Sequence, residues 1–187
     1  MESTTDVELL RRIAGGDAEA VAELYDRHAR MLFALALRIV RERSEAEDVV
    51  HDAFVVVGER AAQYVPERGA VLAWVVTLVR NLSIDRTRRR DRRGAIARDV
   101  LAYDPEATAA ATPANPETEV AGAAERLRVR DALAKLPEVQ RATLETAFYE
   151  GLTYAEIAER EGVPLGTIKS RAARGLAALR EALGEES

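Results

Sequence analysis

Apolar residues recur at helical spacing along most of the chain, and no segment shows the strict alternation that is typical of a half-buried strand. Between residues 17 and 41 the apolar side chains that keep this spacing are Val21, Leu24, Tyr25, Leu32, Leu35 and Ile39. From residue 70 onward the same spacing recurs in Val71, Trp74, Val75, Leu78, Val79 and Leu82. The pattern predicts long helices over both stretches and an all-α fold.

Capping residues and glycines predict where these helices begin and end. A short helix over residues 6–14 is broken by Gly15 and Gly16, and Asp17 caps the next helix, which extends to about residue 41. Ser44 and Glu47 form a capping box that opens a helix to about residue 63. Residues 54–57 have strand propensity, but the cap and the helical spacing favour helix. Residues 64–69 are expected to form a loop.

The middle of the chain has a different composition. Residues 99–124 contain three of the six prolines among alanines and acidic residues. Such a segment buries little apolar surface, so it is expected to be a flexible acidic linker. Helices are predicted over residues 125–136 and 138–149. The expected organisation is two small helical domains, residues 1–98 and 125–187, joined by the linker at residues 99–124.

Residues 152–180 have the pattern of a helix-turn-helix. Thr153 and Glu156 form a capping box, Gly162 supplies a left-handed turn, and Ile168 is expected to be a buried anchor. The second helix carries four basic residues and no acidic one. A unit of this kind places its second helix in the major groove of DNA. The candidate DNA contacts are Thr167, Lys169, Ser170, Arg171 and Arg174, whereas Arg180 is expected to be an exposed charge at the helix end.

Charge is distributed in blocks, although the formal net charge is only -5. Residues 80–93 hold seven arginines against two aspartates, whereas residues 99–125 hold six acidic residues and no basic one. DNA affinity depends on local phosphate contacts, so the arginine block is interpreted as a phosphate-binding segment rather than only a solvated helix end. Tyr64, beside Pro66, is the candidate for base stacking, and Trp74 is expected in the core.

An acidic stripe is predicted on the helix after residue 44. Glu45, Asp48, Asp52 and Glu59 share one helical face with the apolar Val55. Stripes of this kind are usually solvated surface. A valine among the acids makes a basic protein partner the competing interpretation.

No constellation for catalysis or metal binding is visible. The chain has no cysteine, and its only histidines, His28 and His51, lack the sequence neighbours of a metal or acid–base site. We therefore expect no enzyme activity, no cofactor and no metal. The first residues lack a signal peptide and no apolar stretch is long enough for a membrane span, so a cytoplasmic location without membrane insertion is expected.

Taken together, these segments resemble the sigma-70 family of bacterial RNA polymerase specificity subunits, in its extracytoplasmic-function group. SEAEDVVHDAFVVV resembles the family helix that docks on the polymerase clamp. RGAVLAWVVTLVRNLSIDRTRRR resembles the helix that opens and reads the promoter -10 element. Residues 136–180 resemble the domain that reads the -35 element. The three segments occur in the family order.

The resemblance implies roles for particular residues. Asp48, Val49, Asp52 and Val55 would meet the basic clamp of the β-prime subunit. The loop at 64–71 would capture a flipped base, and the -10 contacts would be Tyr64, Arg68, Arg80, Asn81, Asp85 and Arg88. The -35 contacts would be Thr167, Lys169, Ser170, Arg171 and Arg174.

The resemblance also implies partners. These are the RNA polymerase core, through its β-prime clamp and β flap, promoter DNA, and an anti-sigma factor. The chain departs from the family where Ala173 is small and where Gly175 weakens the second helix by about 1 kcal/mol. The base preference therefore does not carry over to this chain.

The function implied is an alternative sigma factor that directs core polymerase to promoters by melting the -10 element and recognising the -35 element. The alternative is a stand-alone helix-turn-helix regulator, which would bind duplex DNA tightly without polymerase. A recombinase or nuclease with a helix-turn-helix tail is a third class. It would need a nucleophile or a carboxylate pair, and Ser83 and Tyr103 form no such arrangement.

Overall fold

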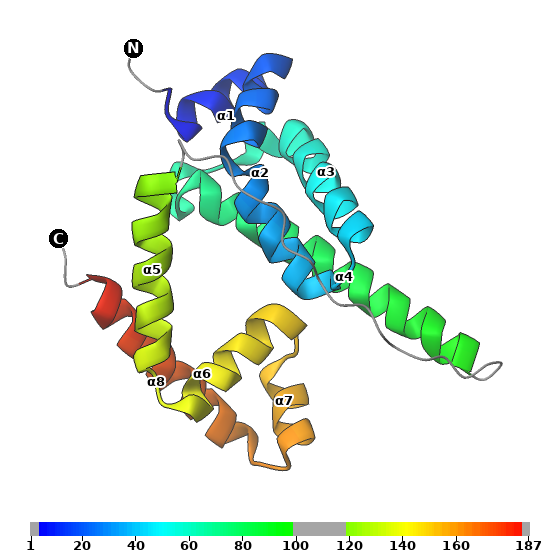
Figure 1. Ribbon diagram of the computed structural model, residues 1–187, viewed down its shortest axis with the longest axis vertical. Coiled ribbons are helices and arrows are strands. Elements are labelled where there is room, and N and C mark those ends of the chain that lie inside the picture. The colour runs from blue at the N-terminus through cyan, green and yellow to red at the C-terminus, as the bar shows by residue number, and fades with distance from the viewer. Residues whose placement is uncertain (1–3, 99–118, 185–187) are drawn as a thin grey trace. The chain divides into compact units, whose positions relative to one another are not determined.

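The computed structural model describes residues 4–98 and 119–184, and every regular element in these residues is helical (Figure 1). The all-α prediction is confirmed. The chain divides into two compact units, Met1–Ala109 and Ala110–Ser187. The boundaries predicted at residues 98 and 125 stay predictions. Residues 99–118 of the expected linker lie outside the described residues, and the segment after them begins helix α5.

The first unit consists of four helices, α1 (Asp6–Ala14), α2 (Ala18–Val40), α3 (Arg43–Arg60) and α4 (Val71–Arg98). Two short 3₁₀ turns, Ala61–Gln63 and Pro66–Arg68, connect α3 to α4. The helix starts follow from side-chain caps. Thr5 forms a capping box with Glu8, and Asp17 accepts hydrogen bonds from the first amides of α2, as its sequence predicts.

Helix α3 starts differently from the sequence prediction. Its cap is Glu42, whose carboxylate accepts the amides of Ser44 and Glu45 at 3.0 and 2.8 Å. The Ser44 hydroxyl donates to the same carboxylate, and this bond is the largest cause that lowers the pKa of Glu42. The capping box predicted at Ser44 is therefore wrong. The longer glutamate side chain, two residues earlier, satisfies the free amides first.

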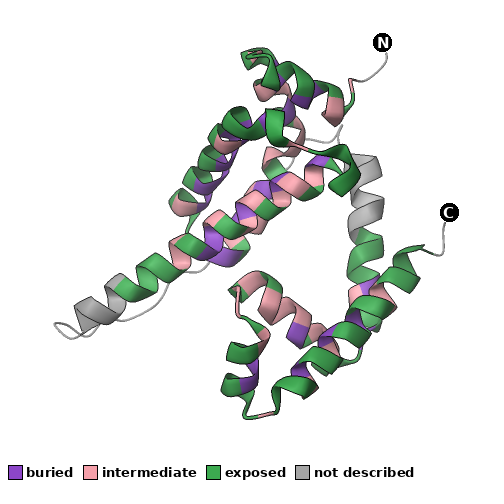
Figure 2. Ribbon diagram, turned by 180° about the vertical axis from the view of Figure 1, so that it is seen from behind, coloured by how far each residue is buried: buried purple, intermediate pink, exposed green. Residues whose placement is uncertain are grey.

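All four helices of the first unit contribute to its core, α1 through Leu9, Leu10 and Ile13. Helix α4 contributes Val71, Val75 and Val79, which are spaced four residues apart and at most 2% exposed. They pack in one cluster with buried side chains of α2 and α3, and buried positions recur along one side of α4 (Figure 2). Full burial of a side chain of this size contributes about 1.5–3 kcal/mol, so the three valines fix the rotation of α4 about its axis.

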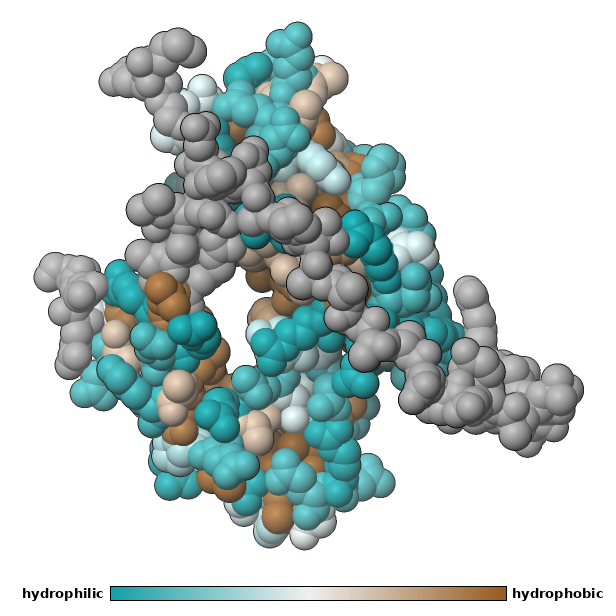
Figure 3. All heavy atoms as spheres, in the orientation of Figure 1, coloured by the Kyte–Doolittle hydropathy of each residue, from teal (hydrophilic) through white to brown (hydrophobic). Residues whose placement is uncertain are grey.

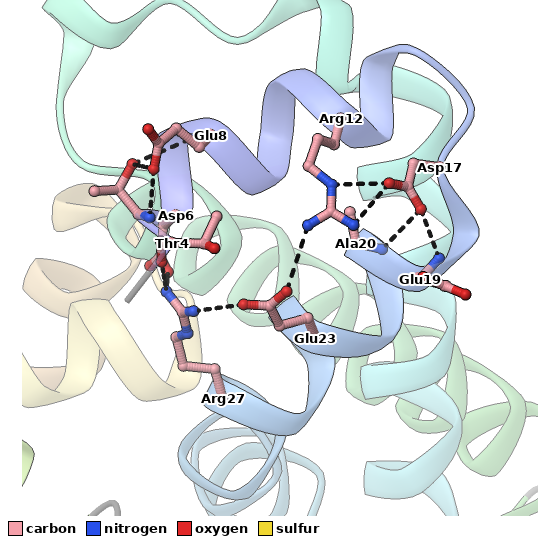
Figure 4. A network of polar contacts seen from close by, with 10 residues as sticks. Thr4, Asp6, Glu8, Arg12, Asp17, Glu19, Ala20, Glu23 and Arg27 are labelled. Carbon is pink, nitrogen blue, oxygen red and sulfur yellow. Dashed lines mark hydrogen bonds and ion pairs between the residues drawn. The ribbon is translucent and has the colours of Figure 1, made fainter. Parts of the chain in front are cut away.

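A polar network ties α1 to α2 (Figure 4). Arg12 lies 2.8 Å from Asp17 and 3.5 Å from Glu23, and Arg27 bridges Glu23 and Asp6 at 3.0 and 2.7 Å. The hydrogen bond from Arg12 is the largest cause that lowers the pKa of Asp17. Arg12 of α1 thus pairs with acids of α2 and its cap, and Arg27 of α2 pairs with Asp6 of α1, so the network adds to the burial of Leu9, Leu10 and Ile13 in holding the short α1 helix.

The second unit contains α5 (Glu119–Lys135), α6 (Glu138–Glu145), α7 (Tyr154–Glu161) and α8 (Leu165–Gly184). A π-helical turn, Thr146–Glu150, extends α6. The helix-turn-helix prediction is confirmed in its local geometry. Thr153 and Glu156 form the capping box, and Gly162 adopts φ +65° at the end of α7.

The helix-turn-helix has a small core of its own. Ile157 and Ile168 are fully buried, and Ala158 is 7% exposed. A small side chain at position 158 lets the two helices approach closely at the turn. The buried anchor that the sequence predicts at Ile168 is thus present.

Two Gly→Ala substitutions should have opposite effects on stability. Gly162→Ala places a side chain at φ +65° and should lower the free energy of unfolding of the second unit by about 1–2 kcal/mol. Gly58→Ala in α3 meets no atom within 4 Å and should raise the stability of the first unit by about 0.5–1 kcal/mol. Denaturant unfolding followed by circular dichroism measures both. A stabilising Gly162→Ala would contradict the turn geometry.

Candidate functional site

Helix α8 has one buried side and one exposed side. Ile168, Ala172 and Gly175 are buried at positions i, i+4 and i+7. Lys169, Ser170 and Arg174 are exposed, and Thr167 is half-buried. The Nε of Arg174 donates to the Ser170 carbonyl at 3.3 Å. The predicted -35 residues, except Arg171, therefore form an exposed, basic surface on the helix that a helix-turn-helix presents to DNA.

Arg171 differs from its neighbours. Its NH1 atom donates to Oε2 of Glu161 at 2.7 Å, and its side chain is only 20% exposed. The sequence predicts Arg171 as a DNA contact, but the structure engages its guanidinium with the last residue of α7. The spacing of 10 residues between the two gives no helical-pattern signal, because a turn separates them.

Gly175 allows α8 to pack closely on α6. A Cβ atom at this position would lie 2.9 Å from Cδ1 of Leu144. From the sequence, Gly175 looks like a weak point of the helix. In the structure the missing side chain is what brings the two helices together, which offsets part of that cost.

The exposed side of α4 carries the predicted -10 residues. Asn81, Asp85 and Arg88 are exposed and recur at positions i, i+4 and i+7, so they share one face. Arg80 lies beside them, and its NH1 atom donates to the Asn81 side chain at 3.2 Å. Burial and then the Arg88 charge lower the pKa of Arg80, but a guanidinium remains charged at neutral pH.

The arginine block is split between two directions. Arg86 donates to the Glu45 carbonyl at 3.1 Å and lies 3.2 Å from the Asp48 carboxylate. Arg90 donates to the Val40 carbonyl at 2.9 Å, at the C-terminal end of α2. These two arginines, one turn apart, hold α4 against the corner between α2 and α3. Sequence reasoning assigns the whole block to phosphate, whereas the structure gives part of it this role.

The loop before α4 is held by Tyr64. Its hydroxyl donates to the Gly69 carbonyl at 2.7 Å, and its ring centroid lies 5.8 Å from that of Trp74. Trp74 packs against the core, as predicted. Tyr64 is half-buried, while Arg68 is exposed. The structure therefore places Tyr64 as the residue that closes the loop, with its side chain partly exposed.

Helix α3 presents the predicted acidic stripe except for Glu45, which is half-buried and lies 3.5 Å from Arg90. Asp48, Asp52 and Glu59 are exposed on one face, and Val55 among them is 50% exposed. The visible surface of this helix is largely hydrophilic in Figure 3. Val49 is a correction, because it is 1% exposed and packs in the core. Position 49 lies about 120° around α3 from position 55, and this rotation turns Val49 into the core, away from the exposed stripe.

The histidine and carboxylate positions do not form a metal centre. In the described residues no group of three or more histidines and carboxylates could hold a metal ion. His28 instead lies 2.7 Å from Asp6, on the side of the α1–α2 network. Within the described helices, none combines the length and apolar character that crossing a membrane requires.

Family comparisons cover both units. Residues 24–93 match the sequence profile described as Sigma-70 region 2, and residues 126–179 match Sigma-70, region 4. The first match contains α3, the loop and most of α4. The second contains the helix-turn-helix. The two matches include every predicted site residue.

Relatives match nearly the whole chain. The chain is 37% identical over 183 residues to the ECF RNA polymerase sigma factor SigK of Mycolicibacterium vanbaalenii, covering 94% of this chain and 88% of that protein. It is 33% identical to SigK of Mycobacterium tuberculosis over 177 residues, covering 94% and 91%.

Among solved structures, the Rhodobacter sphaeroides SigE in complex with the anti-sigma ChrR is 32% identical, with a TM-score of 0.49, and covers 97% of this chain and 99% of that one. The profiles and the relatives agree on one family. The chain belongs to the sigma-70 family of RNA polymerase sigma factors, in the extracytoplasmic-function group.

Proposed function

We propose that three exposed surfaces of this chain divide the work of promoter selection among polymerase docking, -10 capture and -35 reading. The chain is an alternative sigma factor that directs RNA polymerase to promoters. The observation that carries the division of labour is that α3, α4 and α8 each bury one apolar side and expose a polar side of distinct character.

The docking surface is on α3. Asp52 supplies negative charge beside the half-exposed Val55, and Asp48 adds to it because its side chain remains 64% exposed although it pairs with Arg86. A basic helical partner, such as the β-prime clamp, would pair with the acids and bury the valine. Complementary charge of this kind raises the association rate and fixes orientation, and a central apolar contact supplies affinity. The β flap is the proposed contact of the second unit.

The -10 surface is on α4 and the loop before it. Asn81, Asp85 and Arg88 lie on one exposed face of α4, with Arg80 beside them. Tyr64 and Arg68 lie in the loop before α4. We infer that single-stranded bases are held here. Unstacking a base costs a few kcal/mol, and each stacked or pocketed base returns about 1–3 kcal/mol. Captured bases would thus favour the melted state.

The -35 surface is on α8. Lys169 and Arg174 can pair with guanine edges or phosphates, and Thr167 and Ser170 can reach bases or backbone. Ser170 and the exposed Ala173 have small side chains, so the helix can approach the groove floor closely. The helix-turn-helix fixes register on duplex DNA.

The proposed mechanism makes and breaks no covalent bond, so the chain acts as a binding subunit and not as an enzyme. Binding free energy from the three surfaces shifts the equilibrium toward melted promoter. No cofactor or metal is needed for this. A cytoplasmic location is part of the proposal, because the polymerase and the promoter are there.

An anti-sigma factor is a further proposed partner. The similar Rhodobacter sphaeroides SigE is described in complex with the anti-sigma ChrR. A partner that covers the acidic side of α3 or the basic side of α8 would block polymerase or DNA. The stand-alone regulator is the less favoured function, because family membership supports a polymerase subunit.

Core polymerase plus this chain should transcribe specific promoters that core alone does not. The measurement is transcript start-site sequencing after transcription of genomic fragments in vitro. A shared pair of sequence elements upstream of the start sites is the expected result. If core polymerase gains no start-site preference, and the free chain binds a duplex with nanomolar Kd, the regulator alternative is correct.

Asp52→Asn with Val55→Ser should weaken core binding by about tenfold or more, because both charge complementarity and an apolar anchor are lost. Glu19→Gln on α2 is the matched control, since Glu19 is an exposed acid on another helix. Fluorescence anisotropy of the labelled chain titrated with core polymerase measures both. Equal affinity of the wild type, the double variant and Glu19→Gln for core polymerase would rule out α3 as the docking surface.

Arg88→Ala and Arg90→Ala should separate DNA binding from helix packing. Arg88→Ala should reduce the salt dependence of promoter opening by about one phosphate contact, a slope change of about 0.7–0.9 in log K. Arg90→Ala removes the bond to the Val40 carbonyl and should lower stability by about 1 kcal/mol. Permanganate footprinting at several salt concentrations and thermal unfolding report the two effects. The reverse pattern would refute the split of the arginine block.

A further inference from the structure

Two ion pairs hold the end of α7. In one pair α7 supplies the basic residue, and in the other it supplies the acidic residue. Arg160 reaches back to Glu150 and to the Thr146 hydroxyl in the π-helical turn. The next residue, Glu161, reaches forward to Arg171 on α8 at 2.7 Å. Helix α7 is only 8 residues long. The two pairs therefore connect it to the helical segments on both sides in sequence.

The carboxylate of Glu161 is in an electrostatically unfavourable position. It is the last residue of α7, where a carboxylate opposes the helix dipole. Arg171 lies on the other side of the turn formed by Gly162, Val163 and Pro164, and its positive charge pairs with this carboxylate and offsets the unfavourable interaction. The Glu161 and Arg171 side chains are 33% and 20% exposed, so the pair is more shielded than an ordinary surface pair.

Arg171 lies on the flank of α8 that faces α7, one helical turn from Thr167 and Arg174. Ile168 and Ala172 mark the buried side, and Ser170 and Ala173 mark the outer side. At 100° per residue, position 171 falls on the flank between them, toward α7. An arginine that faces α7 and is bonded there has little reach toward the groove.

We propose that Arg171 is a positioning residue for promoter recognition. Its bond to Glu161 sets the angle of α8 relative to α7 and so aims Lys169, Ser170 and Arg174 at the -35 duplex. This inference rests on the proposed -35 function of α8. It predicts that Arg171 contributes to discrimination between sequences and not to the number of phosphates neutralised.

The experiment uses the full chain bound to core polymerase. The probe is a duplex that the wild-type complex enriches from a pool randomised upstream of the start site, and a scrambled duplex is its partner. The dissociation constant for each is measured at several KCl concentrations. The ratio of the two constants reports specificity, and the slope of log K against log salt reports phosphate contacts. A uniform change in charge alters both duplexes alike and cancels in the ratio.

Arg171→Ala and Glu161→Gln should each lower the specificity ratio by about three- to fivefold and leave the salt slope unchanged. The exchanged pair, Glu161→Arg with Arg171→Glu, should restore most of the ratio. Arg174→Ala is the matched control, and it should lower the slope or the ratio without rescue by any change at position 161.

Opposite results would overturn the inference. The alternative is that Arg171 contacts a phosphate and that its pair with Glu161 only competes with this contact. In that case Glu161→Gln strengthens DNA binding, and Arg171→Ala lowers the salt slope by about 0.9. The exchanged pair then does not restore the specificity ratio. A wild-type complex that enriches no sequence would overturn the proposed -35 function itself, and the inference with it. A wild type that enriches a sequence while Arg171→Ala keeps the full ratio overturns the inference alone.

Discussion

The packing of α4 on α2 and α3 is the interaction on which the first unit depends. Val71, Val75 and Val79 are buried every fourth residue, so one side of α4 faces the core along this length. The opposite side is then obliged to carry Asn81, Asp85 and Arg88 outward. Arg86 and Arg90 continue the inward side beyond the valines and bond to α2 and α3. The rotation of α4 about its axis therefore determines both which side chains stabilise the first unit and which side chains form the proposed -10 surface.

The second unit meets a different constraint, since α6 and α7 have only 8 residues each and the central apolar cluster is small. Ile157, Ala158 and Ile168 form that cluster. The remaining order comes from specific geometry: the left-handed Gly162, the side-chain-free Gly175 against Leu144, and the ion pairs at the end of α7. A recognition helix supported by few apolar contacts depends on such polar restraints for its direction. For this reason we assign Arg171 the role of orienting α8 through its bond to Glu161, and not that of an additional positive charge for DNA.

Several sequence interpretations failed for a common physical reason, namely that residue type predicts chemistry but not direction. The family resemblance places Val49 with Val55 at the docking surface, yet the helical rotation buries Val49. The sequence interpretation assigns the whole arginine block to phosphate, yet Arg86 and Arg90 bond to backbone carbonyls of α3 and α2. The cap of α3 is Glu42 and not Ser44, because the Glu42 carboxylate accepts the Ser44 and Glu45 amides and so begins the helix earlier. Each difference depends on a partner distant in space or on local side-chain reach.

The sequence by itself determined the helical fold, the helix-turn-helix with its capping box, and the family, because these depend on local periodicity, caps and motif order. It also indicated which faces carry acids and which carry arginines. Only the tertiary structure decided which charges remain available. Ion pairs such as Arg86 with Asp48 and Arg171 with Glu161 join residues that lie on different helices. No local pattern encodes such pairs, because their distances follow from the packing of whole helices.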